Sequence, residues 1–204
     1  MPREKYLEKI TQRVLDSEKG RLFVVSDFAD IAPSQVIRKS LTRLIETHTL
    51  RRVMRGIYEY PKYSELLQTY VAPSVDNIAK ALARNNNWNI APAGNAAQNI
   101  LGLSTQVPAS HIYVTDGPYK KYQYGKFTII FKHVSNKNIA NMSLITAIVV
   151  QALKSVGKDH VDEMMIAKLK TRLSEDEKKI VCLESRGATA WISDTIQHVC
   201  CITD

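Results

Sequence analysis

The chain has 204 residues, and its 28 Lys and Arg residues outnumber its 20 Asp and Glu residues to give a formal net charge of +8. Hydrophobic residues make up 45% and charged residues 24%, a globular composition that excludes a disordered, collagen-like or disulfide-stapled chain. This length is enough for one large domain or two small ones with a buried core. The basic excess makes a polyanion such as nucleic acid the first partner to consider.

Cysteine usage and hydropathy indicate the compartment. Cys182, Cys200 and Cys201 are too few and too closely spaced for a disulfide framework, which favours a reducing interior. The first residues carry charges where a signal peptide has an apolar run. The most apolar stretch, residues 142–153, is shorter than the roughly 20 residues that a membrane span needs. We therefore expect a cytoplasmic protein with no membrane partner.

The first elements follow in quick succession. Apolar residues at helical spacing predict a helix over residues 6–16, and a β-leaning run follows at 22–25. Ser26 is predicted to cap a brief helix over residues 27–31. Ala32 and Pro33 then interrupt the helical pattern.

An amphipathic helix is predicted next, over residues 35–47, with Ser34 as its N-cap. Two β-leaning runs at 50–53 and 57–60 follow, and Gly56 between them can supply the positive φ of a tight hairpin. The order helix, strand, helix, turn, helix, hairpin is that of a winged helix-turn-helix. We place this domain at residues 1–62.

The basic residues concentrate on this second half of the domain. Residues 34–56 contain six basic side chains and one acidic side chain. Such a helix would enter a DNA major groove, and the hairpin would lie as a wing along the backbone or a minor groove. Arg can bind guanine or phosphate with two bonds, Gln can pair with adenine, and Ser or Thr can donate to phosphate. The predicted DNA-binding residues are Ser34, Gln35, Arg38, Lys39, Thr42 and Arg43 on the helix, and Arg51, Arg52 and Arg55 on the hairpin.

Two other interpretations of this domain remain open. Winged helices also serve as protein–protein modules, and a three-helix packing unit can carry an incidental basic face. DNA binding is favoured because the basic charge, the capped amphipathic helix and the basic hairpin coincide.

Residues 63–204 predict a mixed α+β domain that ends in a helical bundle. A linker helix is expected at 63–70, and three strands separated by turn signals are expected between 111 and 133. Further helices are predicted at 75–84, 96–101, 142–156, 159–173, 174–186 and 189–201, with a short strand at 88–91. The fold class is therefore α+β.

No catalytic constellation stands out in this second domain. Asp159, His160 and Asp162 are the first suspects for metal or acid–base chemistry, but acids at a helix start also complement the helix dipole. His198 beside two cysteines lacks a second ligand pair at zinc-like spacing. We expect no enzyme activity and no cofactor. The alternatives left open are a nucleic-acid- or nucleotide-processing enzyme and a protein-interaction scaffold.

Four runs of sequence resemble the AbiEi-type antitoxins of bacterial type IV toxin–antitoxin systems. They are RGIY at 55–58, APAGNAAQNILGLSTQVP at 91–108, YVTDG at 113–117 and IIFK at 129–132. The likeness spans roughly residues 1–135, and GLSTQVP is its most specific part.

This resemblance implies a two-part function. The winged helix of such proteins binds inverted repeats in double-stranded DNA of its own promoter and represses transcription. The second domain supplies antitoxicity against a cognate nucleotidyltransferase-like toxin, whether or not the two proteins touch. The resemblance implies no catalytic residues.

Overall fold

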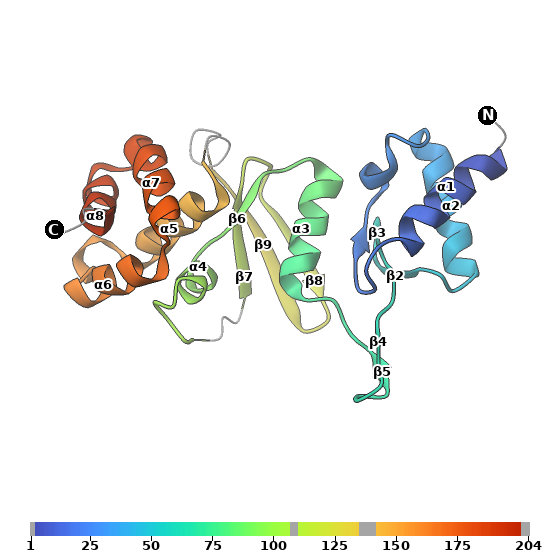
Figure 1. Ribbon diagram of the computed structural model, residues 1–204, viewed down its shortest axis with the longest axis horizontal. Coiled ribbons are helices and arrows are strands. Elements are labelled where there is room, and N and C mark those ends of the chain that lie inside the picture. The colour runs from blue at the N-terminus through green and yellow to red at the C-terminus, as the bar shows by residue number, and fades with distance from the viewer. Residues whose placement is uncertain (1–2, 107–109, 135–141, 201–204) are drawn as a thin grey trace. The chain divides into compact units, whose positions relative to one another are not determined.

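Helix α1 (Arg3–Leu15) and helix α2 (Ser34–Glu46) pack against each other through apolar side chains that recur at helical intervals. A two-residue strand β1 (Leu22–Phe23) and a 3-10 helix η1 (Val25–Phe28) connect them. The computed structural model describes residues 3–106, 110–134 and 142–200, and Figure 1 shows its elements in chain order.

The hairpin predicted after α2 is present. Its strands β2 (Arg51–Met54) and β3 (Ile57–Glu59) are antiparallel, and β1 pairs with the other edge of β3. Gly56 in the turn has a φ of +80°, which glycine adopts without the steric cost of a Cβ atom. The sheet and both helices share one core, which includes Ile10, Val14, Phe23, Phe28, Ile37, Leu41, Leu44 and Leu50.

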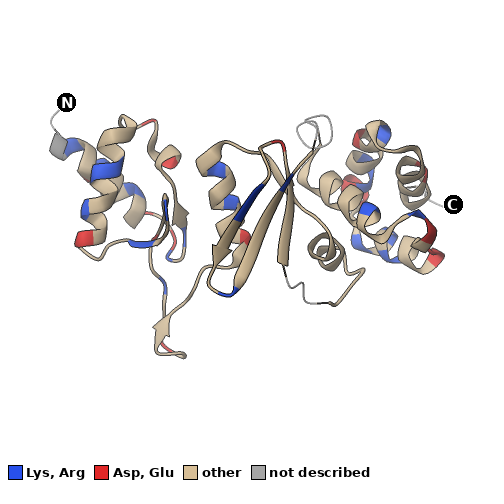
Figure 2. Cartoon of the chain, turned by 180° about the vertical axis from the view of Figure 1, so that it is seen from behind, with Lys and Arg blue, Asp and Glu red and all other residues tan. Residues whose placement is uncertain are grey.

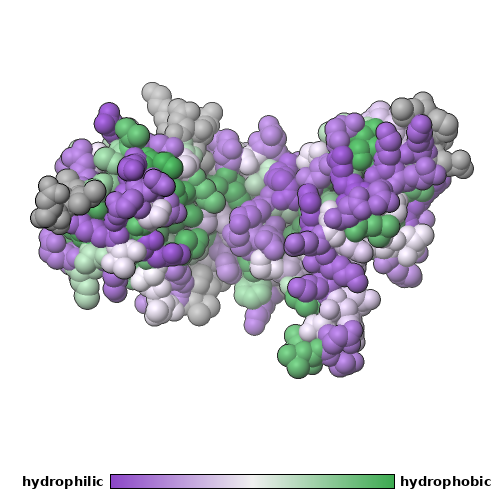
Figure 3. All heavy atoms as spheres, viewed as in Figure 1, coloured by the Kyte–Doolittle hydropathy of each residue, from purple (hydrophilic) through white to green (hydrophobic). Residues whose placement is uncertain are grey.

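The linker helix expected at 63–70 is wrong, because this segment forms a second hairpin. Strand β4 (Tyr63–Ser64) pairs antiparallel with β5 (Thr69–Tyr70), and the two tyrosine rings meet edge to face at 5.3 Å. The intervening Leu66 and Leu67 are 93% and 65% exposed. A helix needs an apolar surface to pack on, and these side chains have none. The hydrophobic tip is green near the lower edge of Figure 3.

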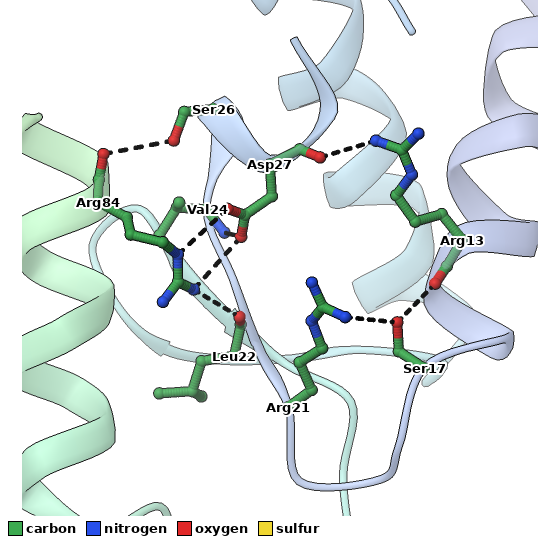
Figure 4. Close-up of polar contacts among 8 residues, drawn as sticks. All are labelled: Arg13, Ser17, Arg21, Leu22, Val24, Ser26, Asp27 and Arg84. Carbon is green, nitrogen blue, oxygen red and sulfur yellow. Dashed lines mark hydrogen bonds and ion pairs between the residues drawn. The ribbon is translucent and has the colours of Figure 1, made fainter. Parts of the chain in front are cut away.

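Helix α3 (Val75–Asn86) belongs with the elements that precede it. The chain divides into two compact units, residues 1–88 and 89–204, whereas the sequence placed the division after Lys62. The reason is long-range packing, because α3 contacts β1, β3 and η1. The side chain of Asp27 links α3 to the preceding elements. It accepts hydrogen bonds from the Val24 amide and from the Arg84 guanidinium of α3 (Figure 4).

The second unit begins with a four-stranded sheet. Its strands are β6 (Ile90–Pro92), β7 (Ser110–Thr115), β8 (Lys120–Tyr124) and β9 (Phe127–His133). They lie in the order β6-β7-β9-β8, and only the β7–β9 pair is parallel. The short helix α4 (Asn95–Ile100) connects β6 to β7. The fold class is therefore α+β, as predicted from the order of expected strands and helices.

Helices form the rest of the second unit. They are α5 (Leu144–Val156), η3 (Lys158–His160), α6 (Glu163–Arg172), α7 (Glu175–Glu184), η4 (Ser185–Gly187) and α8 (Ala190–Cys200). The continuous helix expected at 159–173 is thus broken between η3 and α6. The last helix was expected to end at residue 201, which lies outside the described residues. Within the described part of the chain, no helix has the length and apolarity to cross a membrane.

A hydrogen-bonded carboxylate joins two of these helices. Ser143, the N-cap of α5, donates to Glu184 Oε2 through its hydroxyl at 2.7 Å and its backbone amide at 2.8 Å. Burial acts to raise the pKa of Glu184, but hydrogen bonds from Thr146 and Ser143 outweigh it, and the pKa lies below its ordinary value. The ionised carboxylate therefore stabilises the packing of α5 on α7.

Candidate nucleic-acid interface

Helix α2 separates its apolar and polar residues cleanly. Ile37, Leu41 and Leu44 are buried in the core of the first unit. The six residues of this helix region predicted to contact DNA are all exposed: Ser34, Gln35, Arg38, Lys39, Thr42 and Arg43. From Gln35 onward they recur at intervals of three and four residues, so they lie on one face of the helix.

The cations of this face are unpaired within the described ranges. No carboxylate there lies within ion-pair distance of Arg38, Lys39 or Arg43. The Thr42 hydroxyl donates to the Arg38 carbonyl at 2.9 Å, so it would have to turn away from the helix before it could donate to a phosphate. Gln35, Lys39 and Arg43 also line a shallow hollow of about 160 Å³. The face can therefore engage an anion without first breaking an ion pair among the described residues. Figure 2 marks all described Lys and Arg positions in blue.

The start of the helix differs from the prediction that Ser34 is its N-cap. Pro33 occupies the N-cap position, its carbonyl accepts the amides of Val36 and Ile37, and Ser34 is the first helical residue. No side chain caps this end. The hydroxyl of Ser34 is therefore free of a capping role, and it lies at the positive end of the helix dipole, where phosphate binding is favourable.

The β2–β3 hairpin presents two of its three arginines to solvent. Arg52 and Arg55 are exposed, and neither forms an ion pair within the described residues. Arg51 points elsewhere. Its guanidinium forms an ion pair with Glu59, whose side chain is only 1% exposed, and donates to the Val71 carbonyl at 2.7 Å.

Arg51 is thus part of the fold of the first unit. It faces Glu59 directly across the β2–β3 register, and its guanidinium lies 5.7 Å from the centre of the Tyr70 ring. The sequence contained a signal for this pair, because residues eight apart across a tight hairpin turn can face each other. The burial of Glu59, which makes the pair structural, depends on packing that local patterns do not show.

Asp159, His160 and Asp162, the residues considered for metal or acid–base chemistry, do not form a catalytic cluster among the described residues of the second unit. Asp162 is the N-cap of α6, where its carboxylate accepts the Met165 amide at 2.8 Å. Asp159 and His160 are exposed on η3. Across the described ranges, no group of three His, Cys, Asp or Glu side chains has an arrangement that could hold a metal ion. The role of Asp162 is therefore accounted for by helix capping.

Comparison with known proteins assigns the chain to a family, and the function of that family is unknown. The sequence profile of a family of unknown function (DUF6088) matches residues 9–181, so the match covers both units. No protein of curated function matches the chain.

Proposed function

We propose, for a chain that belongs to the DUF6088 family, that the first unit is a winged helix-turn-helix that binds double-stranded DNA. Helix α2 enters the major groove, and the β2–β3 hairpin acts as the wing. The observation that carries the proposal is a set of exposed cations on α2 and the hairpin that pair with no carboxylate of the described residues: Arg38, Lys39, Arg43, Arg52 and Arg55.

The dimensions and chemistry of this face suit a duplex. Thirteen helical residues extend over about 20 Å, and the major groove, about 12 Å wide, admits one helix. Arg38 and Arg43 lie more than one turn apart, so they can reach different base pairs or phosphates. Arg52 and Arg55 carry charge on a strand and its turn, where a wing meets the backbone. Arg51 is left out of this interface because it is held by Glu59.

The second half of the proposal is that the protein represses its own promoter and acts as the antitoxin of a type IV system in the cytoplasm. Its support is the resemblance of residues 91–108 and 113–117 to AbiEi-type antitoxins. Most of the first run lies in β6, α4 and the segment that follows α4, and residues 107–108 lie outside the described residues. The toxin would be a nucleotidyltransferase-like protein, and the DNA site an inverted repeat.

Binding to the DNA immediately upstream of the gene tests the first half. Fluorescence anisotropy at several salt concentrations should give a slope of log K against log salt of about −4.5, because five cations are free to contact phosphate. Arg38→Ala and Arg43→Ala should each weaken binding by about 1–3 kcal/mol and make the slope shallower by about 1.

Lys168→Ala is the matched control, because it removes one exposed positive charge from α6 in the second unit. Its binding should equal that of the wild type. If the three variants bind alike, or if unrelated duplexes bind as tightly as the upstream DNA, the interface on α2 is refuted.

Antitoxicity has a separate test. Co-expression with the neighbouring gene from an unrelated promoter should restore growth, and the Arg38→Ala/Arg43→Ala double variant should restore it equally. Failure of the wild-type chain to restore growth would remove the antitoxin role. Restoration by the wild type alone would show that antitoxicity requires DNA binding.

A protein-interaction scaffold is the second candidate, favoured by the exposed apolar tip of the β4–β5 hairpin. Two-stranded hairpins are only marginally stable alone, so a bound protein would stabilise this one. Under this alternative, Leu66→Ser/Leu67→Ser would abolish co-purification of a partner while the upstream DNA remains unbound by the wild type.

A further inference from the structure

A cavity of about 480 Å³ lies in the second unit, between its sheet and the C-terminal half of α5. Ile112 and Val114 of β7, Lys132 of β9 and Lys154 of α5 line it. These three elements are labelled in Figure 1. The volume is within the range of sites for small ligands. The sequence analysis assigned no ligand here, although Gly94, Asn95 and Lys132 of the lining belong to the runs 91–108 and 129–132 that resemble AbiEi-type antitoxins.

The backbone explains why these residues meet. Val114 and Lys132 are register partners in the parallel β7–β9 pair, so their side chains share one face of the sheet. Gln151, Lys154 and Ser155 are spaced by three and four residues, which places them on one face of α5. That helix packs on the same side of the sheet through Ala147 and its neighbours.

The charge of the cavity is entirely positive. Among the described residues that line it, Lys132 and Lys154 are the charged ones, and none is Asp or Glu. Within the described part of the chain, neither ammonium group has a carboxylate within ion-pair distance. Two cations that converge on one hollow repel each other, and a bound anion would remove that cost.

Gln151 is a second, independent sign of a ligand. The residue is only 7% exposed, it lines the cavity, and its amide has no hydrogen-bond partner among the described residues. The amide is not among the fully buried groups that lack a partner, so it is accessible from the cavity and can donate to a ligand there.

A hydroxyl is also available in the cavity wall. Ser155 Oγ accepts a hydrogen bond from Gln98 Nε2 at 2.9 Å, so the hydroxyl hydrogen of Ser155 is left to donate. Ser110 and Asn95 add neutral polar groups to the lining. The two ammonium groups carry twice the charge that a single carboxylate would neutralise. They match the three oxygens and the charge near −2 of a phosphate monoester.

We propose that this cavity binds a small molecule that carries a phosphate group, with Lys132 and Lys154 on the phosphate and Gln151 as a neutral donor. Ile112 and Val114 supply an apolar wall for the rest of the molecule. The site lies in the unit that carries no predicted DNA contact, so the proposal does not depend on the function proposed above.

Calorimetric titration of the full chain tests it with AMP, inorganic phosphate and adenosine as probes. AMP should bind saturably, phosphate more weakly, and adenosine at least about tenfold more weakly than AMP, because it lacks the charge-assisted hydrogen bonds. Lys132→Ala and Lys154→Ala should each lower the affinity for AMP at least about tenfold. Lys158→Ala, an exposed lysine outside the cavity lining, should leave it unchanged.

Gln151→Met separates binding from folding. Methionine has a similar length and no unsatisfied donor, so the variant should melt no lower than the wild type while it binds AMP more weakly. Absence of saturable binding by both AMP and phosphate would overturn the proposal, as would an AMP affinity equal to that of the wild type in both Lys132→Ala and Lys154→Ala. A 5′-phosphorylated oligonucleotide that binds far more tightly than AMP, and loses this in Lys154→Ala, would assign the site to nucleic acid instead.

Discussion

Arg51 and Arg52 are neighbours on one strand with opposite predicted roles, and this contrast can be measured. Replacing Arg51 with alanine removes the only cation that pairs with Glu59 in the described structure, together with the bond to the Val71 carbonyl. Replacing Arg52 removes an exposed charge that touches no described carboxylate. The first change should affect folding, and the second should affect DNA binding.

The magnitude follows from the burial of the pair. Removal of one partner from a buried ion pair costs about 3–5 kcal/mol. Because the Arg51 side chain is 36% exposed, solvent screening reduces this to about 2–3 kcal/mol. For a unit of 88 residues, each kcal/mol corresponds to about 4–8 °C, so Arg51→Ala should lower the melting temperature by about 10–20 °C. Arg52→Ala should shift it by about 4 °C or less.

Differential scanning calorimetry measures the melting temperatures, and anisotropy with upstream DNA at about 10 °C measures binding where both variants are folded. Arg51→Ala should bind as the wild type does, and Arg52→Ala should bind at least about fivefold more weakly. Glu59→Gln in the Arg51→Ala background should recover part of the stability, because no buried charge is left unpaired. A stable Arg51→Ala variant with weakened DNA binding would refute this assignment of roles.

Three further outcomes are expected. A fragment of residues 1–88 should fold alone, whereas residues 1–62 should lose the near-ultraviolet circular dichroism of a packed core; equal spectra would contradict the division after residue 88. Because the pKa of Glu184 is lowered by folding, its carboxylate adds to the free energy of unfolding. This stabilisation is fully present above the unfolded-state pKa of Glu184, near 4.5, and is lost as the pH falls through its lower folded-state pKa. Urea denaturation should therefore show that Glu184→Gln destabilises the protein at pH 7 but much less at pH 3, and equal effects at both would contradict it. Gly56→Ala should cost about 1 kcal/mol or more in the same assay because of its positive φ, and a neutral result would contradict that strain.

Local patterns predicted α2 and its outward face well. The apolar residues that face the core recur at helical spacing, and the polar residues between them, from Gln35 to Arg43, are exposed as expected. The start of the helix was misassigned by one position, because Pro33 can hold the N-cap backbone conformation without a capping side chain. The exposed face was predictable because burial of a surface helix follows from its periodicity alone.

The features that the sequence did not predict depend on residues far apart in the chain. Arg84 bonds to Asp27 across 57 positions, and this contact assigns α3 to the first unit. The β4–β5 hairpin contradicts the helical propensity of Leu66 and Leu67, because propensity stabilises a helix little without a surface to pack on. The lining of the cavity in the second unit combines residues of β7, β9 and α5, and the parallel β7–β9 register places Lys132 beside Val114 in that lining.

The attachment of α3 to the first unit also bears on how such genes exchange segments. A recombination junction at Lys62 would separate Asp27 from Arg84 and Arg51 from the Val71 carbonyl, so the resulting chimera would inherit unmatched partners. A junction at Trp88 transfers both pairs intact, together with the whole basic face of α2. Natural shuffling that changes the recognised DNA sequence while it preserves the second unit is therefore expected to join related genes near codon 88.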